Sequence, residues 1–242
     1  FKSVEIMRRV ALFFILIFLS SLTAQLNPNP ERFYPSKIGR EISIEQFVEW
    51  DKKNAFSQNG ILFIGSSSIR LWPTKQYFDY NIINRGFGGA HLSDINHYFD
   101  LIVSKYKPKI IFLYAGDNDI AAKKTPNRFL RDYQKFVRLV DDSIPDCSII
   151  FIPIKPSPAR WKYWGNMKKA NNLVSEYIKK SSNQYYIDTA GPMINDSGRP
   201  ISSLFISDSL HLSSEGYDLW SNIIHPLLEQ VINKNKWKIF NW

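Results

Sequence analysis

The sequence contains one cysteine, Cys147, and this scarcity excludes a disulfide framework and a zinc site made of several thiolates. Cys147 stands beside an apolar run, where a buried packing role is expected. Internal repeats and low-complexity tracts are also missing from the sequence. The 242 residues, 44% of them hydrophobic, are enough material for one globular domain with a sizeable core.

A clustered basic stripe is missing as well, although the formal net charge is +9. The lysines and arginines are scattered, as in "KKTPNRFLRDYQKFVR", a pattern typical of solvated helix faces. A nucleic-acid-binding protein would carry a basic patch, so we expect no nucleic-acid partner. A mild attraction to acidic surfaces or glycans stays compatible with this charge.

No apolar run reaches the roughly twenty residues that a membrane-spanning helix needs. In "MRRVALFFILIFLSSLTAQ", two arginines precede about ten apolar residues and then small polar ones, as in a secretory signal peptide. We predict a signal peptide over residues 1–24, cleaved after Ala24, with Met7 as the natural start and residues 1–6 as upstream read-through. The predicted localisation is secreted or periplasmic, with no stable membrane span after cleavage. An uncleaved N-terminal anchor is the alternative.

Five short runs have the composition of strands buried on both faces of a parallel sheet, because most of them are continuously apolar rather than alternating. They are Ile61–Ile64, Ile82–Asn84, Lys109–Tyr114, Ser148–Ile154 and Tyr185–Asp188. Segments with helical periodicity separate them. This alternation predicts an α/β fold, a three-layer α/β/α sandwich with a flavodoxin-like central parallel sheet of about five strands.

The expected helices have recognisable ends. Four of them follow the strands: Ser93–Tyr106 with Ser93 as the cap, Thr125–Ile144, Trp161–Ser181, and Ser213–Lys234 with Ser213 as the cap. A further helix is predicted over residues 43–57. Residues 25–42 contain three prolines and are expected to form an extended lead-in to the domain.

Polar and small residues follow the predicted strands, at the edge of the sheet where such folds bind ligands. The five segments, in order, contain "GSSSI", "RGFGGAH", "AGDNDI", "KPSPARW" and "SDSLHLS". A serine hydroxyl needs a base to become a good nucleophile, and histidine is the usual base. His211 is a candidate, since Asp208 three residues earlier could orient its ring. A solvated turn is the alternative for this pair.

An acyl-transfer site also needs donors for an oxyanion. Gly86, Gly88 and Gly89 would let the backbone approach a ligand closely, although a flexible turn has the same composition. Asn118 offers a side-chain amide directly after a predicted central strand. A helix cap or an Asx-turn is the alternative role for Asn118.

Four blocks in this order resemble the SGNH (GDSL-like) hydrolase superfamily. They are Gly65-Ser66-Ser67, Gly89, the Gly116-Asp117-Asn118-Asp119 block, and Asp208 with His211. The resemblance extends from about Ile61 to Leu228, within a hydrolase domain over residues 43–242. Two positions depart from the family pattern: Ser66 replaces an aspartate, and Asp117 replaces a residue that is often threonine. The α/β-hydrolase elbow, Gly-x-Ser-x-Gly, is excluded because Ile69 stands where its second glycine would be.

The resemblance implies a serine esterase that works through an acyl-enzyme. Ser67 would be the nucleophile, His211 the base and then the acid, and Asp208 the group that orients His211. The N–H groups of Ser67 and Gly89 and the Asn118 side chain would form the oxyanion hole. No metal and no organic cofactor is implied. A lipid acylhydrolase, an acyltransferase and a catalytically silent binding protein on the same fold are the alternatives.

The substrate is expected to be a small-molecule or glycan ester with a short acyl group, because no amphipathic insertion that could form a lid lies between the blocks. The segment "KPSPARWKYW" places Arg160, Trp161 and Trp164 where they could form a pocket wall. The two tryptophans are three apart and would share one helix face, although core packing is an equal alternative. Asp117 is expected either to bind a substrate hydroxyl or to point into the interior. The sequence leaves the oligomeric state open.

Overall fold

The computed structural model of the protein describes residue 5 and residues 27–34, 44–56 and 58–234. Five parallel strands form one sheet in the order β2-β1-β3-β4-β5. Their bounds are β1 Ile61–Gly65, β2 Ile82–Gly86, β3 Ile110–Tyr114, β4 Ser148–Phe151 and β5 Gln184–Tyr186. Each predicted strand is therefore confirmed, with shifts of a few residues at the ends. The largest shift is in β4, which ends before the prolines at 153 and 156.

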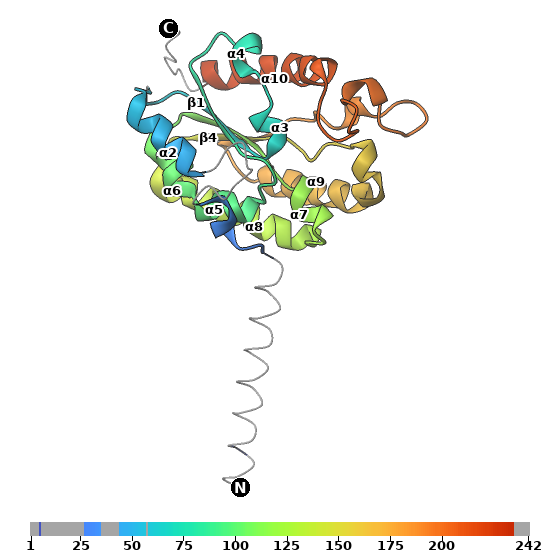
Figure 1. The fold of residues 1–242 in the computed structure, drawn as a ribbon, viewed down its shortest axis with the longest axis horizontal. Helices are drawn as coiled ribbons and strands as arrows, with labels where there is room; N and C mark the ends of the chain where they lie inside the picture. Colours follow the sequence, from blue (N-terminus) through green and yellow to red (C-terminus); the bar gives the residue numbers. More distant parts are fainter. Residues whose placement is uncertain (1–4, 6–26, 35–43, 57, 235–242) are drawn as a thin grey trace.

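Helices cover both faces of the sheet, which explains the continuous apolar runs. On one face, Leu62 and Ile64 of β1 pack into a core shared with helices α2, α5, α6, α8 and α9. On the other face, Ile61 and Phe63 pack into a second core shared with α3 and α10. Figure 1 shows α10 on one side of the sheet and α2, α5, α6, α8 and α9 on the opposite side. The predicted three-layer α/β/α sandwich is confirmed.

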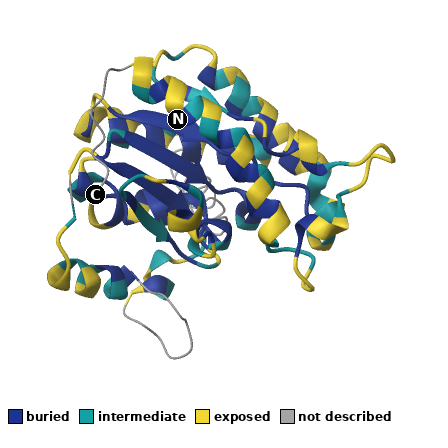
Figure 2. Ribbon diagram, turned by 90° about the horizontal axis from the view of Figure 1, so that it is seen from above, coloured by how far each residue is buried: buried dark blue, intermediate teal, exposed yellow. Residues whose placement is uncertain are grey.

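The helices have the following bounds. The α-helices are α2 Ile44–Lys53, α3 Ser67–Arg70, α4 Thr74–Tyr77, α5 Leu92–His97, α6 Phe99–Ile102, α7 Asp117–Ala121, α8 Pro126–Ser143, α9 Trp164–Ile178 and α10 Ser214–Lys234. The 3-10 helices are η1 Pro30–Phe33, η2 Ser104–Tyr106, η3 Pro158–Tyr163, η4 Gly191–Met193 and η5 Ser202–Leu204. Figure 2 shows that the long helices turn exposed faces outward over a buried sheet.

Two long helices begin with side-chain caps. The Thr125 hydroxyl accepts the Arg128 N–H at 3.2 Å, and Pro126 occupies the first helical position of α8. At the start of α10, the Ser213 hydroxyl accepts the Gly216 N–H at 3.3 Å, so the predicted Ser213 cap is confirmed. Helix α10 continues through Pro226.

The segment Ser93–Tyr106 differs from its prediction as a single helix. It forms three short helices, α5, α6 and η2, and the cap of α5 is His91 instead of Ser93. The backbone N–H of His91 donates to Asp94 Oδ2 at 2.8 Å, and this bond fixes the start of α5. The Tyr98 hydroxyl donates to the Pro30 carbonyl at 2.8 Å, so contacts with η1 hold the chain at the first break.

The described part of the lead-in is also less extended than predicted. Residues 30–33 form η1, and Phe33 is buried with its ring edge against Phe87 at 4.9 Å between centroids. The rest of the predicted lead-in lies outside the described residues. So does the predicted signal peptide, apart from Glu5, and so do Ser43 and Ser57, the predicted ends of the helix observed as α2.

Within the described ranges, no helix combines the length and the apolarity that a membrane crossing requires. The carboxyl ends of all five strands point toward the same edge of the parallel sheet. The segments after β1, β2 and β3 therefore meet there, and the candidate site is built at this edge.

Candidate active site

The three serines after β1 differ in exposure. Ser66 and Ser68 are buried, at 2% and 1% exposed, whereas Ser67 is partly exposed at the first position of α3. The turn is tight because β1 and β3 approach closely at Gly65, where a Cβ atom would lie 2.1 Å from the Tyr114 carbonyl oxygen. Ser67 is thus the one serine of the three whose residue is partly open to solvent, while its two neighbours are buried.

Ser67 Oγ lies 2.9 Å from Nε2 of His211, a residue 144 positions later in the chain. On the other side of the imidazole ring, Nδ1 lies 2.5 Å from Asp208 Oδ2. With the Nδ1 proton directed at the carboxylate, Nε2 is the acceptor for the Ser67 hydroxyl. The structure thus brings together the three residues that the sequence predicts as a catalytic triad.

A compact turn holds Asp208 under His211. Asp208 Oδ1 accepts the N–H groups of Leu210 and His211, each at 2.9 Å. Ser209, directly after Asp208, has a φ of 57°. Burial would raise the pKa of Asp208, but the hydrogen bonds from His211 and Leu210 lower it to about 2. The carboxylate is therefore ionised at neutral pH and able to hold the Nδ1 proton of His211.

A side-chain hydrogen bond joins Asn118, in the helix after β3, to the loop that contains Gly89. Gly89 has a φ of +78°, a conformation that suits glycine. Asn118 belongs to α7, directly after β3, and its Nδ2 donates to the Ala90 carbonyl oxygen at 3.0 Å. An amide nitrogen carries two hydrogens, and the predicted oxyanion role needs the second one.

Asp117 lies in the interior, which is one of the two positions that the sequence left open for it. Its side chain is 4% exposed and accepts hydrogen bonds from Lys155 at 2.7 Å, Arg160 at 2.6 Å and the Tyr114 hydroxyl at 3.1 Å. Burial would raise the pKa of this carboxyl, but the charges of Lys155 and Arg160 hold it below its ordinary value. These donors account for the buried Asp117 carboxylate without a substrate hydroxyl, and the substrate contact stays a prediction.

Arg160 contacts two site residues at once. One guanidinium nitrogen pairs with Asp117, and the other donates to Asn118 Oδ1 at 3.0 Å. Its side chain is 21% exposed, so most of its surface is already covered by protein. These protein contacts account for Arg160 without the substrate contact that the sequence suggested, and that contact stays a prediction.

Trp161 and Trp164 form a stacked pair, with ring centroids 6.1 Å apart and an interplanar angle of 16°. They do not share one helix as predicted, because Trp161 ends up in η3 and Trp164 begins α9. Both rings are partly buried, and the Arg199 guanidinium lies 5.6 Å from the Trp161 ring centroid. Their predicted role as a substrate wall stays a prediction.

Lys155 is the site residue that sequence reasoning missed. It is 1% exposed and donates to the Ser68 hydroxyl at 3.1 Å, the Tyr114 hydroxyl at 3.0 Å and Asp117. The available signal was its place in "IPIKPSP", where a lysine interrupts an apolar run just after a strand. Such a lysine needs a buried anionic partner, and Asp117 is that partner.

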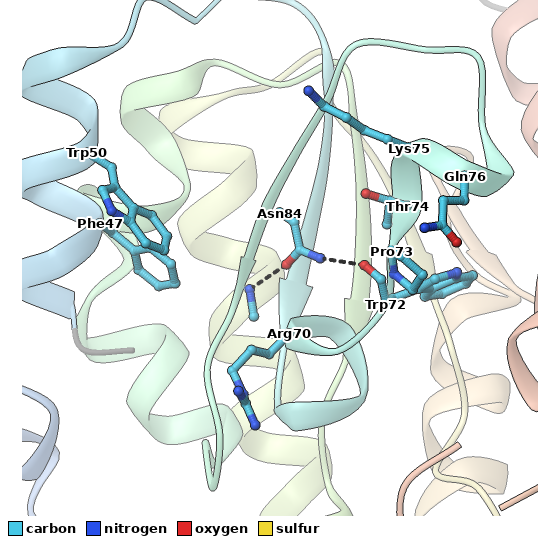
Figure 3. A pocket seen from close by; sticks show the side chains of 10 residues that line it. Phe47, Trp50, Arg70, Trp72, Pro73, Thr74, Lys75, Gln76 and Asn84 are labelled. Atoms are coloured by element: carbon cyan, nitrogen blue, oxygen red, sulfur yellow. Dashed lines mark hydrogen bonds between the residues drawn. The ribbon is translucent and has the colours of Figure 1, made fainter. Parts of the chain in front are cut away.

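A cavity of about 400 Å³ lies beside α3 along the edge strand β2. Figure 3 shows Phe47 and Trp50 of α2 on one side, the Trp72–Gln76 segment on the other, and Asn84 between them. The Asn84 side chain donates to the Ile69 and Trp72 carbonyls at 2.7 and 3.4 Å and accepts the Gly86 N–H at 2.9 Å. Arg70, at the end of the helix that begins with Ser67, also lines this cavity.

In the part of the chain that the structure describes, no group of three or more His, Cys, Asp or Glu side chains is placed to hold a metal ion. The chemistry available here is that of a hydroxyl, an imidazole, a carboxylate and an amide.

Comparison with known proteins gives the site a context. The model of the GDSL-like Lipase/Acylhydrolase family matches residues 71–219, more than half of the chain. The matched range contains Gly89, Asn118, Asp208 and His211, and it begins four residues after Ser67.

Two curated relatives are distant in sequence. An N-acylneuraminate cytidylyltransferase from Escherichia coli is 21% identical over 74% of this chain, and the match spans only 43% of that longer protein. The platelet-activating factor acetylhydrolase IB subunit alpha1 from Bos taurus is 22% identical over 82% of this chain and 86% of its own length.

A solved structure has the same fold. A GDSL-like lipase from Bacteroides thetaiotaomicron superimposes with a TM-score of 0.66 and 18% identity, covering 77% of this chain and 97% of that one.

Proposed function

The chain belongs to the GDSL-like lipase/acylhydrolase family of ester-hydrolysing serine enzymes, and from this premise we propose that it hydrolyses carboxylic esters through an acyl-enzyme formed on Ser67. One observation carries the proposal. Ser67 Oγ, the His211 ring and Asp208 are hydrogen-bonded in series, although they come from opposite ends of the described chain. This is the geometry that activates a serine hydroxyl.

The reaction has two halves. Ser67 Oγ attacks the ester carbonyl while His211 Nε2 takes its proton, and His211 then protonates the leaving alcohol as the carbon–oxygen bond breaks. Water enters, gives a proton to Nε2 and attacks the acyl-serine, and Ser67 recovers its proton when the acid leaves. The N–H groups of Ser67 and Gly89 and the Asn118 amide would stabilise the negative oxygen in both halves.

A short acyl group, acetyl to butyryl, is the substrate that we propose. The connections after β1, β2 and β3 are short, so they supply no inserted lid to cover a long acyl chain. The bovine relative is named as an acetylhydrolase, which points in the same direction. The stacked pair of Trp161 and Trp164 follows Arg160 in the chain and offers an aromatic surface suited to a sugar ring. A glycan ester is therefore the proposed natural substrate class.

Replacement of Ser67 tests the mechanism. We expect Ser67→Ala to lower kcat for p-nitrophenyl acetate by about 10⁴-fold or more, because the nucleophile and its base act as a unit. Ser66→Ala is the matched control, since Ser66 is the buried neighbour on the same turn, and it should keep most of the activity. Mass spectrometry after fluorophosphonate treatment should locate the label on Ser67. Labelling of another serine, or an active Ser67→Ala variant, would falsify the assignment.

A p-nitrophenyl ester series from acetate to palmitate tests the acyl preference. We expect kcat/KM to be greatest between acetate and butyrate, and to be unchanged after incubation with EDTA. A maximum at decanoate or longer would favour the lipid acylhydrolase instead. Ester products formed in the presence of an added alcohol would favour the acyltransferase, and absence of both turnover and labelling would favour a silent binding protein.

A secreted or periplasmic location is also part of this proposal, and it rests on the order of charged, apolar and small residues in residues 1–24. Expression with and without these residues, followed by cell fractionation, tests it. Retention of the full-length chain in the membrane fraction without processing would support the uncleaved anchor.

A further inference from the structure

A buried ionic network lies behind the candidate oxyanion hole. At its centre is Asp117, whose two carboxylate oxygens face different cations: Oδ2 pairs with Lys155 at 2.7 Å, and Oδ1 pairs with Arg160 at 2.6 Å. Asp117 and Lys155 are 4% and 1% exposed. Charges this deeply buried are strongly destabilising unless each is paired, so the three side chains hold one another in a fixed arrangement.

Each of the two cations, Arg160 and Lys155, also donates a hydrogen bond to a residue at or next to the proposed catalytic site. Arg160 donates to Asn118 Oδ1 at 3.0 Å, and Lys155 donates to the hydroxyl of Ser68, which follows the nucleophile directly. The turn that carries Arg160 is tied to the His211 turn as well, because the Ala159 N–H donates to the Ser209 carbonyl at 3.0 Å. The network therefore connects the loops after β3 and β4 with the turn after β1.

The contact between Arg160 and Asn118 decides which way the amide points. A guanidinium group only donates hydrogen bonds, so Arg160 selects the orientation in which Asn118 presents Oδ1 to it. The Ala90 carbonyl only accepts, so it selects the same orientation by receiving Nδ2 at 3.0 Å. The reversed amide would put Nδ2 against a cation and Oδ1 against a carbonyl oxygen, and both contacts would be repulsive.

We propose that Arg160, anchored by Asp117, is a positioning residue that orients the Asn118 amide so that Nδ2 faces the reacting carbonyl. This rests on the proposed function, because it assumes that Asn118 stabilises the oxyanion. Arg160 then acts through Asn118, without contacting the substrate. Asp117 in turn holds the Arg160 guanidinium in place, so that Arg160 can pair with Asp117 and donate to Asn118 Oδ1 at the same time.

A double-mutant cycle separates an action through Asn118 from a direct contact. Arg160→Met should lower kcat for p-nitrophenyl acetate by about 10- to 100-fold with KM nearly unchanged, as a small misplacement of a catalytic group does. In the Asn118→Ala background, the same change should lower kcat by no more than about twofold, because its target is already gone. Arg160→Lys should recover part of the activity, because it keeps the positive charge beside Asp117 but lacks the two guanidinium nitrogens that bind Asp117 and Asn118 together.

Arg138→Met is the matched control, since Arg138 is an exposed arginine of α8, and it should leave kcat unchanged. Circular dichroism and thermal unfolding of each variant establish that it is folded. Equal effects of Arg160→Met in the two backgrounds would overturn the proposal. So would an effect on KM alone, which would mark Arg160 as a substrate-binding residue.

A second measurement does not depend on activity. In nitrogen-15 NMR spectra, Arg160→Met should shift the side-chain amide signals of Asn118 and speed their exchange with water, and Arg138→Met should not. Unchanged Asn118 signals would overturn the positioning role whether or not the protein hydrolyses esters. If the Arg160→Met signals move as expected but the wild type hydrolyses no ester, the proposed function fails and the orienting contact stands.

Discussion

At the scale of single residues, Asp208 is held by hydrogen bonds from its own turn. Two backbone N–H groups and the His211 ring donate to it, and these bonds lower the pKa of the carboxyl to about 2 against the effect of burial. Its charge is therefore constant across the pH range of an ordinary esterase assay. A change of rate with pH in that range has to come from another group.

Replacement of Asp208 by its amide isolates the orienting role. We expect Asp208→Asn to lower kcat by about 10³- to 10⁴-fold, because an amide can donate to the imidazole and so favours the tautomer with the proton on Nε2. Initial rates with p-nitrophenyl acetate would measure the loss. Asp196→Asn is the control, since Asp196 lies on an exposed turn. A loss below about tenfold would mean that His211 keeps its orientation without the carboxylate.

At the scale of helices and strands, a second buried lysine joins three helices. Lys124 is fully buried and pairs with Asp119 of α7 and Asp132 of α8, each at 2.7 Å. Asp119 in turn accepts the Leu92 N–H, at 3.2 Å from Oδ1, where α5 begins. Burial would lower the pKa of Lys124, but the two carboxylates raise it, so the ammonium group stays charged.

Removal of this ammonium group should destabilise the fold far more than removal of an exposed one. We expect Lys124→Met to lower the free energy of unfolding by about 3–5 kcal/mol, because it removes the cation between two buried carboxylates and leaves Asp132 with Arg128, at 3.5 Å, as its one cation among the described residues. Urea denaturation measures the change. Lys123→Met is the control, since its neighbour Lys123 is exposed. Similar midpoints for the two variants would contradict this account of the cluster.

The predicted strands are confirmed because continuous apolar runs between turn residues carry enough local information to mark them. The division of Ser93–Tyr106 into three short helices could not be predicted from such local patterns. Its apolar spacing is compatible with one helix, and a contact from Tyr98 to the distant Pro30 fixes the chain at the break. The interior position of Asp117 likewise depends on Lys155, 38 residues later in the chain.

For the candidate site, the sequence predicts which residues meet, because parallel strands bring their carboxyl ends to one edge. Ser67, Asp208 and His211 were predictable for this reason, together with a family resemblance. The orientation of the Asn118 side chain could not be predicted from the sequence. Its Oδ1 and Nδ2 are nearly the same size, and only the hydrogen-bond partners around them determine which way the amide points.

At the scale of the whole molecule, acid should weaken the fold. Burial would raise the pKa of Asp51, Asp117 and Asp208, but the cations and donors around each carboxyl lower it instead. Their folded pKa values lie below the ordinary value of about 3.9, so the unfolded chain binds protons more readily. The stability that these carboxylates contribute is present above about pH 4 and is lost as the pH falls through their folded pKa values. Asp94 acts in the opposite sense: burial raises its pKa, so its ionised form is destabilising, and this penalty is relieved as the pH falls toward about 4.

We therefore expect the melting temperature to fall steadily from about pH 4 to about pH 2, and differential scanning calorimetry would measure it. In Asp51→Asn the decrease should be smaller, because one of the three carboxylates no longer titrates. Asp142→Asn, at an exposed position of α8, should follow the wild type. A melting temperature independent of pH over this range would contradict the assignment of these carboxylates as a source of stability.

The separation of 144 positions between Ser67 and His211 also sets the order in which a growing chain acquires its parts. The ribosome delivers the nucleophile, at the start of α3, early, together with the glycine loop and Asn118. The base arrives only with the turn before α10, the last helix of the described chain. Closing so long a loop is slow relative to forming local helices, so the hydroxyl gains its proton acceptor late in folding. A nascent or truncated chain carries an unactivated serine, and the return of activity during refolding reports the completion of the whole sheet.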